Sequence, residues 1–71
     1  MGDQVRAEMV ANVLAILVAV GDEVAAGDSL LILESMKMEI PVLAERPGRV
    51  SAVGVALGDV VQEGDVLVEL D

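Results

Sequence analysis

Two stretches of this chain are closely similar: GDEVAAGDSL at residues 21–30 and GDVVQEGDVL at residues 58–67. They belong to a longer internal repeat, in which residues 5–34 align with residues 42–71 and 14 of the 30 aligned pairs are identical. Stacked repeat arrays generally need at least about three units for stability. Two copies therefore predict a pair of small sheets related by a pseudo-twofold axis, with residues 35–41 between the copies.

Each copy alternates short aliphatic runs with Gly-Asp turns. Glycine adopts positive φ without a steric penalty, and an aspartate side chain can bond to nearby backbone in a turn. We therefore expect Gly21 and Gly58 to hold equivalent turn positions with positive φ. Turn chemistry also accounts for the Gly-Asp pairs without a metal site, since they lack the dense Asp-x-Asp spacing of a calcium loop.

The sequence predicts an all-β fold: a flattened β-barrel or sandwich of about eight short strands in two pseudo-twofold-related halves, a barrel-sandwich hybrid. Gly or Pro interrupts almost every window that a helix would need. The predicted strands cover residues 4–9, 12–19, 23–25, 29–35, 39–43, 49–55, 60–62 and 66–70. All 71 residues are assigned to one domain, 1–71, near the size at which a single apolar core just suffices.

Composition narrows the classes of protein to which the chain can belong. It contains no Cys and no His, which excludes disulfides and a structural zinc site. A net charge of −9 argues against binding to nucleic acid or to anionic membranes. The longest apolar run, Val13–Val20, is far shorter than the ~18 residues that span a bilayer, and the N-terminus does not resemble a signal peptide. We expect a cytoplasmic protein that is monomeric when isolated.

The only lysine, Lys37, lies in the segment SMKMEIP, residues 35–41, which separates the two copies. The predicted strands on either side are too close in sequence for any connection but a hairpin, which places Met36, Lys37 and Met38 around its tip. Such a lysine is ordinarily only a solvated charge, and the two methionines could fold back onto the core. Turns rarely use methionine, however, and exposed thioethers are typical of recognition surfaces.

The motif ESMKME, residues 34–39, resembles the attachment motif of the biotinyl domains of biotin-dependent carboxylases, whose usual form is Glu-Ala-Met-Lys-Met. The resemblance extends from Val5 to Leu70, and the chain is similar to the short stand-alone biotinylated proteins of actinobacteria. It departs from the pattern at Ser35, where Ala is usual, and over residues 8–12, which lack the Pro and Gly commonly found before the second strand. Neither departure touches the lysine.

The resemblance implies that a biotin protein ligase attaches biotin covalently to Lys37, and that Met36 and Met38 are recognised by the ligase and by partner enzymes. Three flanking residues complete the hairpin motif: Glu34, Ser35 and Glu39. It further implies a carrier that shuttles carboxylate between a biotin carboxylase and a carboxyltransferase. No catalytic residue is expected, because the serines of the chain have no His, Cys or Tyr to assist them.

Two alternatives stay open at the level of sequence. A lipoyl carrier shares the fold, the pseudo-symmetry and the lysine hairpin, but lipoyl domains generally lack the double methionine. An unmodified barrel-type domain could serve only to bind another protein. Intact mass separates biotin from lipoate, and a streptavidin blot separates a biotinylated chain from an unmodified one.

Overall fold

The computed structural model describes residues 2–71 and contains every strand that the sequence predicts, which confirms the all-β class. The strands are β1 (Asp3–Arg6), β2 (Ala11–Ile16), β3 (Glu23–Val24), β4 (Ser29–Ser35), β5 (Met38–Leu43), β6 (Gly48–Val53), β7 (Val60–Val61) and β8 (Val66–Leu70). They are rich in Val, Leu and Ile, residues that pack well on a pleated surface. Within residues 2–71 there is no helix with the length and apolarity that a membrane crossing requires.

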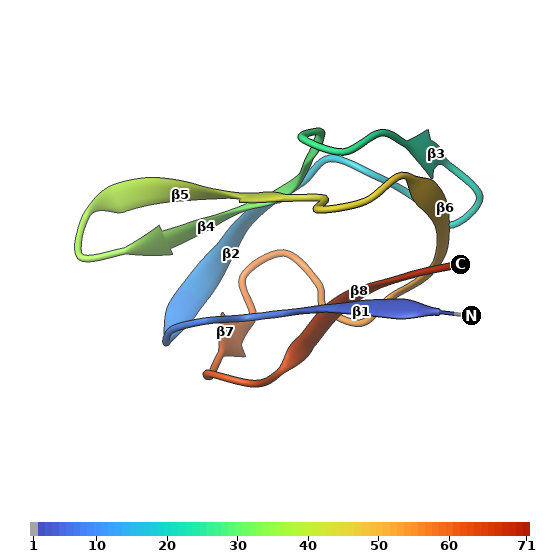
Figure 1. The fold of residues 1–71 in the computed structure, drawn as a ribbon. Coiled ribbons are helices and arrows are strands. Elements are labelled where there is room, and N and C mark those ends of the chain that lie inside the picture. The colour runs from blue at the N-terminus through green and yellow to red at the C-terminus, as the bar shows by residue number, and fades with distance from the viewer. Residues whose placement is uncertain (1) are drawn as a thin grey trace.

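The strands form two antiparallel sheets, with the orders β1-β8-β6-β3 and β5-β4-β2-β7 (Figure 1). Replacing each strand of one copy by its counterpart in the other, β1 by β5 and so on, converts the first order into the second. Each sheet therefore takes two strands from each copy of the repeat. The predicted pseudo-twofold arrangement is confirmed.

The Gly-Asp turns are equivalent in the two halves. Gly21 has φ 98° and Gly58 has φ 86°, a region that residues with a side chain disfavour. The aspartate that follows each glycine accepts a 2.9 Å hydrogen bond from the backbone N–H three residues before it, Asp22 in one half and Asp59 in the other. The expected equivalence and positive φ of these two glycines are confirmed.

The turns at Gly21 and Gly58 are each bonded to a strand of the other half. The N–H of Gly21 donates to the carbonyl of Val50 on β6 at 2.8 Å, and the N–H of Gly58 donates to the carbonyl of Val13 on β2 at 2.9 Å. These backbone groups are satisfied only when both halves are folded. The two halves are therefore interlocked.

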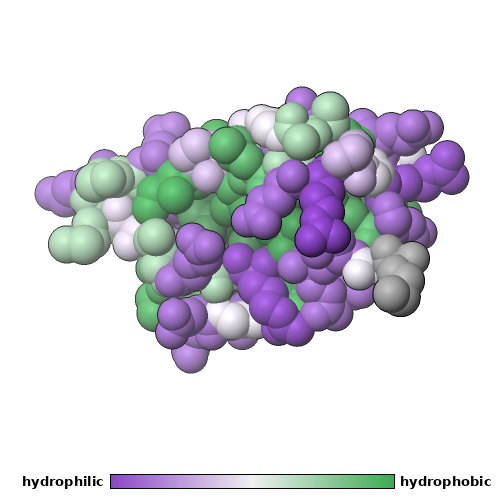
Figure 2. Space-filling model, in the orientation of Figure 1, coloured by the Kyte–Doolittle hydropathy of each residue, from purple (hydrophilic) through white to green (hydrophobic). Residues whose placement is uncertain are grey.

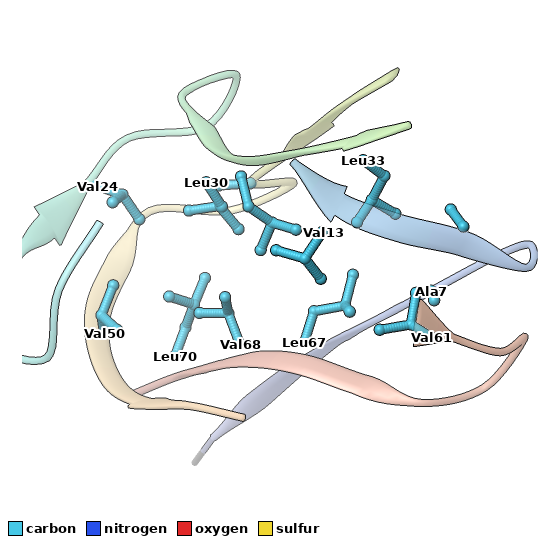
Figure 3. Close-up of a cluster of buried hydrophobic side chains, with 13 residues drawn as sticks. Ala7, Val13, Val24, Leu30, Leu33, Val50, Val61, Leu67, Val68 and Leu70 are labelled. Carbon is cyan, nitrogen blue, oxygen red and sulfur yellow. The ribbon is translucent and has the colours of Figure 1, made fainter. Parts of the chain in front are cut away.

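The core lies between the two sheets and takes equivalent side chains from both halves (Figure 3). Leu30 and Leu67 are fully buried, and Val13 and Val50 are 2% and 1% exposed. Full burial of each such side chain contributes about 1.5–3 kcal/mol. Packing of aliphatic side chains from both sheets is thus what holds the sandwich together.

The β4–β5 hairpin projects from one end of the molecule, beyond the region where the two sheets cover each other (Figure 1). At the other end β1 pairs with β8, with Asp3 opposite Leu70, so the described ends of the chain lie side by side. The Cα positions extend over 32 × 18 × 17 Å. The hairpin tip and the two chain ends are therefore at opposite poles of an elongated body.

Candidate functional site

The hairpin tip is a two-residue turn. Ser35 on β4 pairs with Met38 on β5, which leaves only Met36 and Lys37 between the strands. Both turn residues have positive φ, 53° and 63°. This is the requirement of a type I′ turn, whose twist matches that of the two flanking strands. The structure therefore narrows the predicted tip from three residues to Met36 and Lys37.

Residue type does not predict positive φ at Met36 and Lys37, because the residues that usually adopt it are Gly, Asn and Asp. The available signal was the length of the connection. The second strand was predicted to begin at residue 39, whereas β5 begins at Met38 and leaves a loop of two residues. A two-residue hairpin loop would have predicted left-handed backbone at both positions.

The strands below the tip fix its position. Leu33 of β4 is 2% exposed and pairs with Ile40 of β5, so the base of the hairpin is anchored in the core. A two-residue turn also fixes the pairing register of its strands, and a slip by one residue would reverse every side chain. The backbone of Lys37 is thus held in one place while its side chain is exposed to water.

Both methionines that flank the lysine are exposed, Met36 at 92% and Met38 at 62%. The alternative that they fold back onto the core is wrong. In Figure 2 hydrophobic residues gather toward the hairpin end at the left, and hydrophilic residues dominate the middle of the view. Two bare thioethers beside an amine make a surface that a partner protein can recognise.

Lys37 is exposed, and among residues 2–71 the one ion pair joins Arg49 to Glu23. No carboxylate of the described chain therefore lies within salt-bridge distance of the Lys37 ammonium. The chain has no His, Cys or Tyr that could assist a nucleophile. The arrangement presents a solvent-exposed amine at the hairpin tip.

The remaining predicted site residues lie on the two strands below the tip. Glu34 and Glu39 are directly opposite each other, Glu34 half-buried and Glu39 exposed. Ser35 is half-buried and pairs with Met38. The hairpin thus brings all six predicted residues together, and it places two carboxylates on one face of the hairpin next to the lysine.

The chain is similar to known proteins over most of its length. The family described as "Biotin-requiring enzyme" matches residues 2–70. The biotinylated protein TB7.3 of Mycobacterium tuberculosis (strain ATCC 25618 / H37Rv) is 59% identical over 44 residues, 62% of each chain. Its homologue in Mycobacterium leprae is 61% identical over the same length. The match thus spans less than two thirds of these relatives.

The biotin/lipoyl attachment protein of Bacillus subtilis is 48% identical over 66 residues, 93% of this chain and 90% of that protein.

Two solved carboxylases contain a region of the same fold. The urea carboxylase of Kluyveromyces lactis matches with a TM-score of 0.94 and 32% identity, over 100% of this chain and 6% of that one. A single-chain, multi-domain long-chain acyl-CoA carboxylase matches with a TM-score of 0.90 and 34% identity, over 96% of this chain and 7% of that one.

Proposed function

Because this chain belongs to the biotin/lipoyl attachment family, a family of non-catalytic carriers, we propose that it is a biotin carboxyl carrier with Lys37 as its biotinylated residue. One observation carries the assignment to this residue. The only lysine of the chain is exposed on a two-residue turn, between two exposed methionines. The biotinylated relatives and the carboxylases of the same fold support biotin as the cofactor.

Attachment forms an amide between the carboxyl group of biotin and the Nζ atom of Lys37. A biotin protein ligase supplies the activated acyl donor, removes a proton from the ammonium and releases the leaving group of the donor. The exposed amine and its lack of a salt bridge fit this reaction. The amide is uncharged, so the modified side chain can enter an active site without the cost of burying an ammonium.

When attached, biotin supplies an acceptor that takes a carboxyl group in one active site and gives it up in another. The role of the chain is placement. A covalent tether keeps the group at a high local concentration, and the hairpin keeps the base of the tether fixed. The likeness to carboxylases implies carboxylase partners. The specific partners we propose are a biotin carboxylase and a carboxyltransferase.

Five further residues of the hairpin are assigned to recognition. Met36 and Met38 offer flexible apolar contacts on either side of the amine. The flanking residues that complete the motif are Glu34, Ser35 and Glu39. In this proposal the ligase and the partner enzymes recognise the whole hairpin, and only Lys37 is modified.

The test is Lys37→Arg, which retains a positive, flexible, solvated side chain but removes the amine that can be acylated. Wild type and variant are co-expressed with a biotin protein ligase and compared by intact mass and streptavidin binding. Biotin is expected on the wild type only, and carboxyl transfer in a reconstituted complex should be lost in the variant. Intact mass also distinguishes a biotinyl group from a lipoyl group.

The thermal midpoint is the control for folding. Lys37 is exposed and has no buried partner, so the free energy of unfolding should change by no more than about 0.5 kcal/mol. Biotin on the Lys37→Arg chain would refute the assignment, since only the N-terminal amine would then remain as an acceptor.

A further inference from the structure

The two pseudo-twofold-related sheets have different outer faces. Ile32 on β4 lies between the buried residues Leu31 and Leu33, so it points away from the core. The register of the strands extends this outward row to three residues: Ala15, Ile32 and Pro41. The equivalent outward row on the other sheet is Ala52, Glu69 and Gln4. At two of these three positions one sheet is thus apolar where the other is polar, and the third is Ala in both.

In that row Ala15 and Ile32 are half-buried and Pro41 is exposed. Three further positions on the hairpin-bearing sheet repeat the contrast: Leu14, Leu43 and Val60, which are 43%, 46% and 64% exposed. We name these six residues of the hairpin-bearing sheet the outer patch: Leu14, Ala15, Ile32, Pro41, Leu43 and Val60. Their equivalents in the other sheet are Ser51, Ala52, Glu69, Gln4, Arg6 and Glu23. Five of the six positions are therefore polar in one sheet and apolar in the other.

The repeat provides an internal control for the meaning of this difference. Equivalent positions have equivalent strands and pairing, so the backbone tolerates polar side chains at these places. On the polar sheet two of these side chains make local contacts: Glu23 pairs with the neighbouring Arg49 at 3.7 Å, and the Ser51 hydroxyl donates to the backbone carbonyl of Glu69 at 3.2 Å. The fold thus does not require an apolar outer patch, and another role must account for it.

We infer that the outer patch is the docking surface for the enzyme that loads the carboxyl group onto biotin at Lys37. This inference rests on the proposed function. The patch is continuous with the hairpin, because β4 and β5 carry the tip and three of the patch residues, Ile32, Pro41 and Leu43. Pro41 lies three residues from Met38, about 10 Å along the strand. A protein that covers the patch therefore has the tip of the hairpin within reach of its active site.

The charges beside the patch specify the chemistry of the partner. Glu34 and Glu39 lie on the same outer face, between the patch residues Ile32 and Pro41 and the tip, in the cross-strand row that continues through Asn12 to Val60. An enzyme that carboxylates biotin binds an anionic donor of the carboxyl group, so we expect cationic side chains at the entrance of its active site. These cations would face Glu34 and Glu39, while an apolar surface covers the patch. A second copy of this chain is disfavoured as the occupant, because each copy carries a net charge of −9.

The test replaces two residues of the outer patch without changing the charge, in the double variant Ile32→Gln and Leu43→Gln. Val20→Gln is the matched control: Val20 is 65% exposed but lies in a turn outside the patch. Each chain is biotinylated, checked by intact mass and thermal midpoint, and assayed as the substrate of a biotin carboxylase at saturating co-substrates. The KM for the double variant should rise about tenfold with kcat unchanged, as expected when interface anchors are lost, and the control should match wild type.

Several results would overturn the inference. One is an equal KM for wild type and the double variant. Another is slower biotinylation with normal carboxyl loading, which would assign the patch to the ligase, and slower carboxyl transfer alone would assign it to the carboxyltransferase. A wild-type dimer that the double variant converts to monomer, with KM unchanged, would assign the patch to a second copy.

A single variant replaces the double variant in the test if the double variant is less stable than wild type. If the double variant has a lowered thermal midpoint, Leu43→Gln alone carries the test, because Arg6 occupies the equivalent position in the other half. Failure of the proposed function is detected separately. It would appear as a wild-type chain without biotin in the intact mass, before any KM is measured.

Discussion

Met36 and Met38 expose their thioethers on either side of the lysine, and their contribution can be separated from packing. Replacing both with Leu keeps approximate volume and apolarity, and the free energy of unfolding should change by less than about 1.5 kcal/mol. If the flexible thioethers are what the enzymes recognise, biotinylation or carboxyl transfer should slow. The measurement is the rate of both steps beside the thermal midpoint. Unchanged rates in both steps would remove the recognition role.

At the scale of single residues, the sequence predicted where Lys37 lies but not the conformation that holds it. Its uniqueness and its place between two copies of a repeat pointed to an exposed tip. The left-handed backbone at Met36 and Lys37 could not be inferred from residue type, since neither is a usual residue for it. The flanking strands impose it, because only a turn of this hand matches their twist.

At the scale of the hairpin, the turn favours residues that the chain does not have there. A non-glycine residue in the left-handed region costs about 1 kcal/mol, and Asn is among the residues that tolerate it best. Met36→Asn should therefore stabilise the protein by about 0.5–1 kcal/mol in chemical denaturation while biotinylation slows. A variant that is less stable than wild type would contradict this account of the turn. Met38→Asn, at a position without positive φ, is the control.

The facing carboxylates of Glu34 and Glu39 give a second prediction for the hairpin. Like charges directly opposite each other on neighbouring strands destabilise a sheet. Glu39→Gln should therefore raise the thermal midpoint at low ionic strength. The gain should shrink in high salt, because the repulsion between exposed charges is then screened. A gain that is independent of salt would show that repulsion between these carboxylates is not its cause.

The strands illustrate what periodicity can and cannot predict. Aliphatic runs and turn signals predict all eight strands. They place the ends of the first two at residues 9 and 19, whereas β1 ends at Arg6 and β2 ends at Ile16. Both contain a register irregularity, after Val5 and after Val13, where strict alternation fails. Beyond β1, the N–H of Ala7 donates to the backbone carbonyl of Asp65 outside the regular ladder. Contacts of this kind, between residues far apart in sequence, leave no mark in the local pattern.

At the scale of the whole molecule, the pseudo-symmetry makes a quantitative prediction. Gly21→Ala and Gly58→Ala each place a side chain at positive φ, while the added Cβ meets no atom within 4 Å at either site. Only the backbone conformation is penalised, so each change should cost about 1–2 kcal/mol. The two losses, measured by chemical denaturation, should agree within about 0.5 kcal/mol. Stabilisation at one site with damage at the other would break the equivalence of the halves.

The repeat predicted that the halves are equivalent but not that they are interlocked. Sequence identity between the copies shows which residues correspond, such as Gly21 and Gly58. It does not show that each turn bonds to a strand of the opposite copy, as Gly21 does to Val50. Such pairings form only after distant parts of the chain meet. The entropy cost of closing the loop between them depends on that separation and cannot be read from the local sequence.

The opposite placement of the hairpin and the chain ends sets how far the carrier can reach. A fusion partner joined to either end is attached at the pole away from Lys37 (Figure 1). The folded body, 32 Å along its longest extent, then acts as a stiff spacer between the anchor and the arm. A flexible linker needs roughly 25 residues to span about 25–30 Å on average. The folded body spans a comparable distance as a rigid rod. The conformational entropy that such a linker would lose when the arm enters an active site is therefore not lost here.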